Sequence, residues 1–587
     1  MTVAVTTALS AGLHAHRLGD LNKAIAVYGA VLDLAPDHPT ARHLRGFALL
    51  QSGRIADARL DLQAAVRAAP TNGNAWMHLS VCLDRLGQSA TQTARRAVLL
   101  QPGGQEALDV LVRHRSGEDR ALRWLLALAP GDATVWRRAG LARARRTPAF
   151  AATDFRRALC LAPADPWIGL DLAEVERRIL RPETALMLAD RALVVLPADP
   201  RALADRAASA IELDAVSPAL ADTHRAALLD PAHTAAWGNR AETLYRLARY
   251  EAAVTCGSRA RVTAPTDPEV LANLAAYRLA TGDLAGGWPI FRNRPARRGI
   301  PGPDLPRWSG EAGVRLLVLT EQGLGDELLF STLWSDLDRQ LAQGRLAAVT
   351  VEADERLIPL GARALPRLAW RRRLRPNPAD GPFTHWCLAG DLMELLRPDI
   401  ASFAAARPGL APDPNRVAEW HGWLDRETRG RPAIGLCWRS GSRAGHRRRH
   451  YPTLGDCAAL LSLTNRFFVV LQYDDCRSDL EGLALGTGTE IVLPPDLDRH
   501  DDQEGVAALM AALDLVVSAD TAVLALAGAL GVPAVGFSLH PGWVALGQGR
   551  QPWFPRIERV FRPPDMPWPE AMSEVARTVE RVLSDRT

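Results

Sequence analysis

The stretch VRLLVLTEQGLGDELLF, residues 314–330, decides how the second half of the chain folds. An apolar run over Leu316–Leu319 stops at Glu321–Gln322, two glycines follow, and a further apolar run begins at Leu328. This order is typical of a buried strand, a tight turn and the start of a helix. The sequence therefore predicts a strand–turn–helix unit of an α/β domain at this place.

The turn of this unit contains the candidate loop residues Gln322, Gly323 and Gly325. The two glycines would permit positive φ angles and close approach of the backbone to a ligand. Asp326 follows directly, and two interpretations of it stay open. It either caps the helix, since aspartate accepts hydrogen bonds from first-turn amides, or acts as a general base toward an acceptor hydroxyl.

Composition excludes several classes of protein. The 587 residues are 48% hydrophobic and 23% charged, with a net charge of +4, so general polyanion binding is not indicated and nucleic acid is not an expected partner. The N-terminal sequence lacks a basic segment followed by an apolar core, and no apolar run reaches the roughly 18 residues of a membrane span. We expect a cytoplasmic protein without an integral membrane segment. The seven cysteines lack CxxC spacing, which favours buried reduced thiols.

Prolines recur regularly in the first half of the chain, each after an Ala/Leu-rich run. They are Pro36, Pro70, Pro102, Pro130, Pro163, Pro197, Pro231 and Pro265. Most intervals are 34 residues or close to it. A period near 34 with two amphipathic helices per unit is typical of tetratricopeptide repeats (TPRs).

Several residues fit the turns and contacts of such repeats. Gly19–Asp20 and Gly282–Asp283 are expected between the two helices of the first and last units. Ala24, Ala58 and Ala252 are expected to let helices approach closely. One helix pair cannot bury its apolar face alone, so the units should stack into a solenoid. The solenoid either spaces or dimerises the chain, or offers a concave groove to a protein or peptide.

Beyond the repeats, strand-like and helix-like runs alternate, which predicts parallel sheets. The expected strands are Val314–Thr320, Leu346–Glu352, Ala433–Trp438, Phe467–Gln472, Leu513–Ser518 and Val532–Phe537, with a further strand, turn and helix over Thr384–Leu396. Two Rossmann-like domains with a cleft between them would result, with ligands at the carboxyl ends of the strands. The predicted division is a repeat solenoid over 1–290, a connector over 291–312, one domain over 313–412, a linker over 413–432 and a second domain over 433–587.

A second loop, GLCWRSGSRAGHRRRHYP, is predicted to hold a phosphate-bearing ligand. Small residues let the backbone approach a phosphate, and guanidinium groups grip it bidentately. The alternative is a solvated arginine loop. The candidate donor-binding residues of this loop are Trp438, Ser440, Gly441, Arg447 and Arg449.

A third stretch, LDLVVSADTAVLALAGALGVP, places Asp520 and Thr521 at the start of a helix. Free amides and a hydroxyl at a helix N-terminus favour a phosphate or a ribose. A plain N-cap by Asp520 is the alternative. The acids and histidines elsewhere lack metal-ligand spacing, so no metal or cofactor is predicted.

Together these stretches resemble bacterial proteins in which TPRs are fused to a GT-B glycosyltransferase domain. EQGLGDELLF, IGLCWRSGS, FVVLQ and DLVVSADTAVLALAGALGVP are similar, in that order, to the heptosyltransferases of glycosyltransferase family 9. The architecture is also similar to eukaryotic O-linked N-acetylglucosamine transferase. The resemblance implies an α-helical TPR solenoid followed by an α/β GT-B fold, with a nucleotide sugar as substrate and no cofactor.

The resemblance also implies roles for single residues. Asp326 falls on the proposed catalytic aspartate of the family, and Arg449 in RHYP on its phosphate-binding lysine. Gln472 ends a donor-domain strand that faces the nucleotide, and Asp520–Thr521 fall on the pair that contacts the donor. Ala525 stands where the family carries a histidine, which implies a different donor sugar or weakened catalysis.

The sequence thus predicts a metal-independent, inverting transferase. It would move a sugar from a nucleotide sugar to a Ser or Thr hydroxyl of a protein bound by the TPR array. Flagellin is the expected acceptor, because some of the resembling fusions modify it. Two alternatives stay open: a transferase for a lipid or polysaccharide acceptor, and a non-catalytic TPR adaptor with a degenerate GT-B domain.

Overall fold

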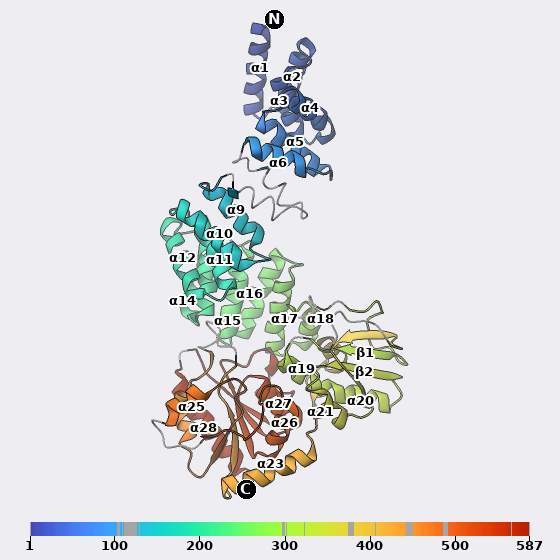
Figure 1. The fold of residues 1–587 in the computed structure, drawn as a ribbon, viewed down its shortest axis with the longest axis vertical. Coiled ribbons are helices and arrows are strands. Elements are labelled where there is room, and N and C mark those ends of the chain that lie inside the picture. The colour runs from blue at the N-terminus through green and yellow to red at the C-terminus, as the bar shows by residue number, and fades with distance from the viewer. Residues whose placement is uncertain are drawn as a thin grey trace. The chain divides into compact units, whose positions relative to one another are not determined.

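The computed structural model describes the chain in two compact units, Met1–Val195 and Leu196–Thr587, and each is considered by itself (Figure 1). The residues that the structure leaves undescribed are 1, 102–105, 108–109, 111–125, 128, 296–299, 301, 322, 374–380, 406, 442–449, 485–490, 565 and 586–587.

The first unit consists of antiparallel helix pairs. Its helices are α1 (Thr2–Arg17), α2 (Leu21–Leu34), α3 (Pro39–Gln51), α4 (Ile55–Ala68), α5 (Gly73–Arg85), α6 (Thr91–Leu100), α9 (Ala133–Arg143), α10 (Pro148–Leu161), α11 (Pro166–Arg178) and α12 (Pro182–Val195). Gly19 takes a left-handed φ of 80° between α1 and α2, and Asp20 caps α2 by accepting from the Lys23 N–H. Such a cap stabilises a helix by about 1 kcal/mol. The predicted helix–turn–helix repeats are confirmed.

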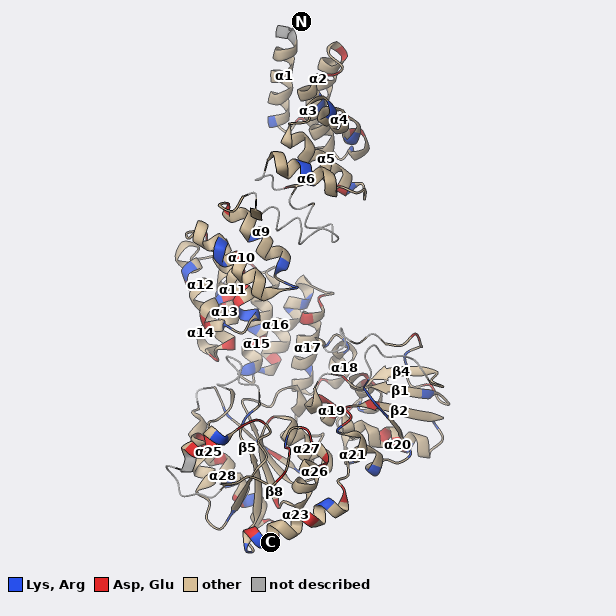
Figure 2. Cartoon of the chain, viewed as in Figure 1, with Lys and Arg blue, Asp and Glu red and all other residues tan. Residues whose placement is uncertain are grey.

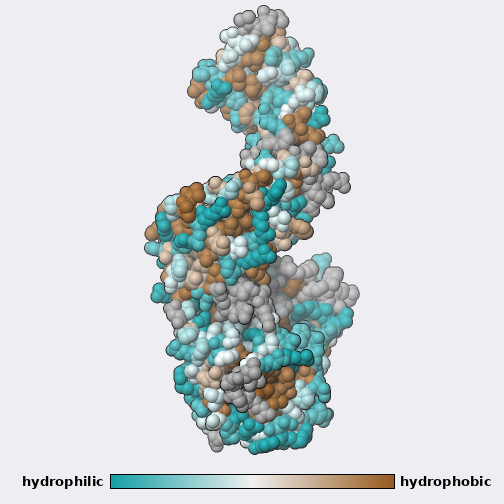
Figure 3. All heavy atoms as spheres, turned by 60° about the vertical axis from the view of Figure 1, so that its left-hand side comes forward, coloured by the Kyte–Doolittle hydropathy of each residue, from teal (hydrophilic) through white to brown (hydrophobic). Residues whose placement is uncertain are grey.

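Exposed apolar side chains mark α10 and α12 of this unit. Phe150, Met187 and Val194 are 67%, 71% and 83% exposed. Apolar patches are visible on the helical part of the chain in Figure 3. Exposed apolar surface of this kind is common where a protein binds a partner.

The second unit begins with six more helices in the same pattern. They are α13 (Pro200–Glu212), α14 (Val216–Leu229), α15 (Thr234–Arg246), α16 (Tyr250–Thr263), α17 (Pro268–Thr281) and α18 (Leu284–Phe291). Gly282 and Asp283 form the predicted last turn, with a φ of 85° at Gly282. Ala24 and Ala58 are fully buried, as expected, but Ala252 is exposed, because its neighbour Ala253 occupies the buried position instead.

The first sheet follows, with four parallel strands in the order β3-β2-β1-β4. Its elements are β1 (Arg315–Leu319), α19 (Leu324–Phe330), α20 (Trp334–Ala342), β2 (Ala348–Ala353), α21 (Ile358–Ala364), β3 (Ala369–Arg372), β4 (His385–Leu388) and α22 (Leu392–Leu396). Four apolar residues of β1 are buried, as the opening stretch predicts. Strand β3 is an addition, since its sequence AWRR gives no apolar run.

The second sheet has six parallel strands in the order β10-β9-β8-β5-β6-β7. Its strands are β5 (Ala433–Cys437), β6 (Phe467–Val470), β7 (Ile491–Val492), β8 (Leu515–Ala519), β9 (Ala534–Ser538) and β10 (Ile557–Phe561). Its helices are α24 (Ala458–Leu461), α25 (Arg477–Ala484), α26 (Gln503–Ala512), α27 (Ala522–Leu530) and α28 (Trp568–Ser584). The predicted parallel sheets are therefore present, although β7 and β10 were not predicted.

The segment predicted as a linker contains a helix of its own, α23 (Pro414–Thr428), capped by Asp413. Acidic and basic residues alternate along it (Figure 2). One hydrophobic cluster joins the last repeat helices to both sheets, through residues such as Leu279, Trp288, Val318 and Val516. Shared burial of this kind explains why α13–α18 form one unit with the sheets.

Candidate functional site

The second sheet brings two of the predicted loops together. Because β5 lies between β6 and β8, the chain leaves β5 toward one edge of the sheet and returns on its other side. Ligands of open α/β sheets bind at such a switch point, outside the carboxyl ends of the strands. Ser440 and Gly441 follow β5, and Asp520 and Thr521 follow β8. These four predicted residues therefore flank the switch point.

The first sheet has a switch point of the same kind between β1 and β4. Glu321 follows β1, and Asp391 follows β4. Gly323 precedes helix α19 in an extended conformation, with a φ of −92°, and Gly325 lies inside the helix. Neither Gly323 nor Gly325 takes a positive φ angle, so the expected use of positive φ at these two glycines is wrong.

Helix α19 of the first sheet packs against helix α27 of the second, and the two are neighbours in Figure 1. Gly325 lies at this contact. A Cβ added there would lie 3.8 Å from Ala522, an ordinary contact distance. An alanine would therefore also fit at Gly325, and the close approach of its backbone to a ligand stays a prediction.

A cavity of about 240 Å³ lies at this junction of the two sheets. Its polar lining consists of Asp326, Asp520, Thr521 and Gln551. The rest of the wall is small or apolar and consists of Gly325, Leu329, Ala522, Leu524, Ala525, Trp543, Val544, Phe554 and Ile557. The structure therefore brings the predicted Asp326 to the predicted Asp520–Thr521 pair.

Asp326 lies in the first turn of α19, whose N-cap is Gly323. It is therefore not the N-cap, although the Gly323 N–H donates a hydrogen bond to its carboxylate. Burial and the nearby negative charge of Glu321 raise the pKa of Asp326 to about 6, against the lowering effect of that hydrogen bond. A carboxylate with a pKa near the working pH suits a general base.

Glu321 is buried and heavily hydrogen-bonded. Arg294 donates to its two carboxylate oxygens, through Nε at 2.8 Å and Nη2 at 2.5 Å. The Gly390 N–H donates to Oε1 at 2.8 Å. A bidentate arginine pair of this kind fixes geometry as well as charge. Glu321 is therefore a fixed negative charge beside Asp326, and it links the connector to the carboxyl ends of β1 and β4.

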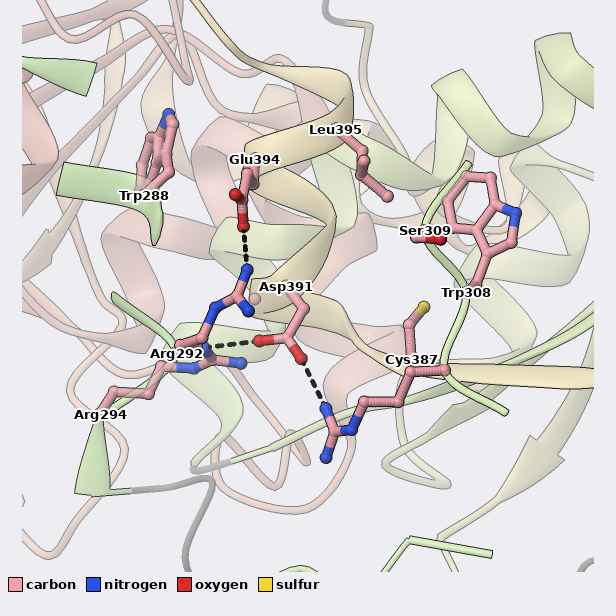
Figure 4. A pocket seen from close by; sticks show the side chains of 11 residues that line it. Trp288, Arg292, Arg294, Trp308, Ser309, Cys387, Asp391, Glu394 and Leu395 are labelled. Atoms are coloured by element: carbon pink, nitrogen blue, oxygen red, sulfur yellow. Dashed lines mark hydrogen bonds and ion pairs between the residues drawn. The ribbon is translucent and has the colours of Figure 1, made fainter. Parts of the chain in front are cut away.

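A second cavity, of about 380 Å³, lies beside this ion-pair cluster. Figure 4 shows Asp391 between two arginines. Arg294 Nη1 donates to Oδ1 of Asp391 at 2.8 Å, and Arg307 Nη1 donates to Oδ2 at 2.9 Å. The Arg307 guanidinium lies 4.2 Å from the centre of the Trp386 ring. The ion pairs of Asp391 with Arg294 and Arg307 could not be predicted from the sequence, because single arginines in a Pro- and Gly-rich connector form no recognisable pattern.

Thr521, and not Asp520, is the N-cap of α27, and its hydroxyl accepts from the Val523 N–H at 3.3 Å. The capping alternative for Asp520 is therefore wrong. The Asp520 carboxylate instead pairs with Arg559, with Nη2 and Oδ2 2.7 Å apart. Its side chain remains 46% exposed, whereas that of Arg559 is 4% exposed. A buried guanidinium thus orients Asp520 at the edge of the cavity.

Two of the predicted donor-binding residues have fully buried side chains. Trp438 is fully buried in the core of the second sheet. Gln472 is also fully buried, and its amide donates to the Arg439 carbonyl at 3.0 Å and to Asp474 at 2.7 Å. These side chains support the loop after β5 and are not placed to contact a donor.

Ser440 and Gly441 form the predicted small turn above Trp438. The Gly441 N–H donates to the Tyr473 hydroxyl at 2.7 Å, and the Ser440 hydroxyl lies 3.3 Å from the same oxygen. A Cβ on Gly441 would lie 2.7 Å from the Tyr473 ring, so glycine is needed for this contact. Gln322, Arg447 and Arg449, which were also predicted for the site, lie outside the described residues.

The wall of the 240 Å³ cavity is held from the repeats. The Tyr245 hydroxyl on α15 accepts from the Trp543 N–H at 2.7 Å, and the Tyr250 hydroxyl on α16 accepts from the Gly542 N–H at 3.2 Å. Gly547 packs so closely on Gly282 that a Cβ would lie 2.8 Å from the Gly282 nitrogen. The last repeats therefore set the position of Trp543.

Two further properties of the described residues bear on metal binding and on membrane insertion. The described part of the chain contains no group of three or more His, Cys, Asp or Glu side chains arranged to hold a metal ion. None of its helices combines the length and the apolar character needed to cross a membrane. All seven cysteines are free; six are buried, as predicted, and Cys160 is exposed.

Comparison with known proteins identifies the repeats. The tetratricopeptide repeat family model matches residues 9–73 and 44–99. Protein FlbA of Caulobacter vibrioides is 33% identical over 346 residues, which cover 55% of this chain and 58% of FlbA. The TPR repeat-containing thioredoxin TTL4 of Arabidopsis thaliana is 35% identical over 86 residues, or 15% of this chain and 12% of TTL4. This chain therefore contains TPRs, and it spans little more than half the length of FlbA.

Solved structures of repeat proteins are also similar. Yeast Tom70 is 14% identical with a TM-score of 0.30, over 49% of this chain and 84% of Tom70. A tetratricopeptide repeat protein of Parabacteroides merdae is 15% identical with a TM-score of 0.32, over 46% of this chain and 97% of that protein.

Proposed function

We propose that this chain is a GT-B glycosyltransferase that moves a sugar from a nucleotide sugar to a Ser or Thr hydroxyl of a protein. The observation that carries this proposal is the cavity that Asp326 shares with Asp520 and Thr521. It lies where helices from two parallel sheets meet, each of which has a switch point beside it. Such an arrangement suits an enzyme that holds a donor on one sheet domain and an acceptor on the other.

The chemistry requires a base on the acceptor side. Asp326 would take the proton of the acceptor hydroxyl while the hydroxyl oxygen bonds to the anomeric carbon of the donor. The bond from that carbon to the nucleotide phosphate breaks at the same time, and the nucleotide leaves with the electron pair. The raised pKa of Asp326, about 6, supports this role, because the carboxylate is ionised at neutral pH and still basic enough to accept a proton.

The leaving phosphate requires positive charge or N–H donors on the donor side. Helix α27 begins directly after Thr521, at the carboxyl end of β8, and helix N-termini favour anions. Arg447 and Arg449, in the undescribed loop, are proposed to add guanidinium donors.

The TPR array supports a protein-interaction role, because stacked repeats offer extended binding surfaces. We propose that it binds the acceptor protein and that this acceptor is flagellin. The resemblance to repeat–transferase fusions that modify flagellin supports this choice.

The test uses the purified full-length chain with flagellin and a pool of uridine, guanosine, cytidine and thymidine sugar nucleotides. We expect flagellin to gain the mass of one or more sugars. Asp326→Asn should abolish the gain, whereas Asp425→Asn, at an exposed position on α23, should not. An unchanged flagellin mass with the wild-type chain and the complete native sugar pool would contradict the proposal.

Ala525 favours a second function, that of a TPR adaptor. It lines the cavity where the resembling enzymes carry a histidine, so an imidazole is missing from the wall. The adaptor function predicts tight binding of flagellin without any binding of sugar nucleotides. Calorimetric titration with both types of ligand separates the two functions.

A further inference from the structure

Gln551 is a buried polar residue with an unused hydrogen-bonding atom. Its side chain is 8% exposed and lines the 240 Å³ cavity. Its Oε1 has no hydrogen-bond partner within the described part of the chain. Buried acceptors are normally paired, so an unpaired one at a cavity points to a ligand that supplies the donor.

The other polar groups of the cavity define what that ligand can be. Asp326 and Asp520 contribute carboxylates, which accept hydrogen bonds, and Thr521 contributes a hydroxyl that already accepts from Val523. The charge of Asp520 is offset by Arg559, so it is the carboxylate of Asp326 that would repel a phosphate inside the cavity. The occupant must therefore bring hydrogen-bond donors, such as hydroxyl or amide N–H groups.

The remaining wall sets the shape and the size. Ala525, Trp543, Val544 and Phe554 present apolar surface. A volume of about 240 Å³ corresponds to roughly eight water molecules in the liquid, which is comparable to a single sugar ring. A ring with hydroxyl or amide donors at its edge and C–H groups on its face matches both the polar and the apolar parts of the cavity wall.

We propose that Gln551 is a specificity-determining residue whose Oε1 accepts a hydrogen bond from a hydroxyl or amide N–H of the donor sugar. This inference rests on the proposed transfer function. It places the sugar ring between Gln551 and Trp543, with the nucleotide phosphates outside the cavity, between the first amides of α27 and the turn at Ser440.

Two substitutions separate recognition from structural support. Gln551→Leu removes the acceptor at nearly constant size. Gln548→Leu makes the same change three residues away, at an exposed position on the same segment. Because Oε1 has no hydrogen-bond partner among the residues that the structure describes, Gln551→Leu should leave the Tm unchanged or raise it. A residue that only supports the fold would instead lower the Tm when it is replaced.

The measurement is calorimetric binding to the full-length chain. The probes are UDP-glucose, UDP-N-acetylglucosamine, GDP-mannose and CMP-N-acetylneuraminic acid, each beside its free nucleotide. For the probe that the wild type prefers, Gln551→Leu should weaken binding about tenfold and change binding of the free nucleotide less than twofold. Gln548→Leu should change neither.

Three results would overturn the inference. Sugar nucleotide binding by Gln551→Leu within twofold of the wild type would remove Gln551 from recognition and leave the proposed function standing. Equal losses for the sugar nucleotide and the free nucleotide, with a lower Tm, would show a structural role. A wild-type chain that binds none of the probes and none of the nucleotides would contradict the proposed function itself, and the inference with it.

Discussion

The hydroxyl of Tyr245, on repeat helix α15, accepts a hydrogen bond from the backbone N–H of Trp543, which lines the cavity between the sheets. The distance is 2.7 Å, and Tyr245 is 9% exposed. Tyr245 also contacts the His540 ring edge-on, with centroids 5.0 Å apart. The last repeat helices and a candidate active site are therefore joined by specific contacts within one unit.

Tyr245→Phe tests this contact between the repeats and the cavity wall. The substitution keeps the ring and leaves the part-buried Trp543 N–H without the Tyr245 acceptor, which costs about 1–3 kcal/mol. We expect urea unfolding of the variant to show a loss of that size, together with weaker binding of the sugar nucleotide. Tyr28→Phe is the matched control, because its hydroxyl makes only a 3.4 Å contact with His16 in the first unit. Equal stability losses in both variants would contradict a special role for Tyr245.

Asp326→Asn should stabilise the protein while it removes activity. The pKa of Asp326 is raised to about 6, so the folded chain holds this proton more tightly than the unfolded chain does. The protonated Asp326 therefore makes its full contribution to the free energy of unfolding below pH 4, and this contribution is lost as the pH rises through 6. At pH 8 the buried carboxylate therefore costs about 3 kcal/mol, from about two pKa units at 1.36 kcal/mol each.

The amide variant avoids that cost and can still accept the Gly323 hydrogen bond. We expect its free energy of unfolding to exceed that of the wild type by about 1–3 kcal/mol at pH 8, with roughly half that gain at pH 5. Asp425→Asn should show neither effect. A variant less stable than the wild type at pH 8 would show that Asp326 supports the fold.

Glu321→Gln should shift the pH dependence of transfer. The Glu321 charge is one of the two causes that raise the pKa of Asp326, so its removal should lower that pKa while burial continues to raise it. The acid limb of the pH–rate profile should move to lower pH, because Asp326 would stay ionised further into the acid range. Glu311→Gln, at an exposed position, should leave the limb in place. A shift to higher pH in Glu321→Gln would contradict the assignment of Asp326 as the base.

The division of the chain into units predicts where it can be shortened. A chain that begins at residue 196 retains the contacts of Tyr245, Tyr250 and Gly282 with the segment around Trp543. A chain that begins at residue 300 loses them and exposes apolar surface of the shared core. We expect the first to be monodisperse in size-exclusion chromatography and the second to aggregate.

The same shortened chain separates protein from lipid or polysaccharide acceptors. If the first repeats bind the acceptor protein, the chain from residue 196 should lose transfer to flagellin and keep its affinity for the sugar nucleotide. Unchanged transfer to flagellin by this chain would show that residues 1–195 are not needed for recognition. Transfer to a lipid or polysaccharide acceptor instead would favour that alternative.

Local patterns in the sequence were enough for the repeats and for most of the strands. The proline period, Gly19–Asp20 and Gly282–Asp283 all mark repeats correctly, because they depend on neighbours along the chain. The same holds for α27, which begins after Asp520–Thr521 as predicted. Short edge strands such as β7 are not visible in the sequence, since two residues form no periodic pattern.

Only some of the candidate site residues could be predicted from the sequence. Asp326 and Thr521 lie at the starts of helices that follow apolar strands, so their places in the fold could be predicted. Gln551 and Trp543 lie in a segment without periodicity, and the contact of Trp543 with Tyr245 on the distant helix α15 is not visible in the sequence. Trp438 was assigned to the site as the last residue of a predicted strand, although its ring is buried in the core. Side-chain direction at the end of a strand is set by packing, which a single sequence does not show.

The most direct test is the intact mass of flagellin from cells that carry the native sugar pathway and either the wild-type chain or Asp326→Asn. The variant must be folded and must bind flagellin as the wild type does. We predict a sugar-sized mass increase with the wild-type chain and none with Asp326→Asn. An equal increase with both would contradict the role of Asp326, and no increase with either, despite flagellin binding, would contradict glycosyl transfer.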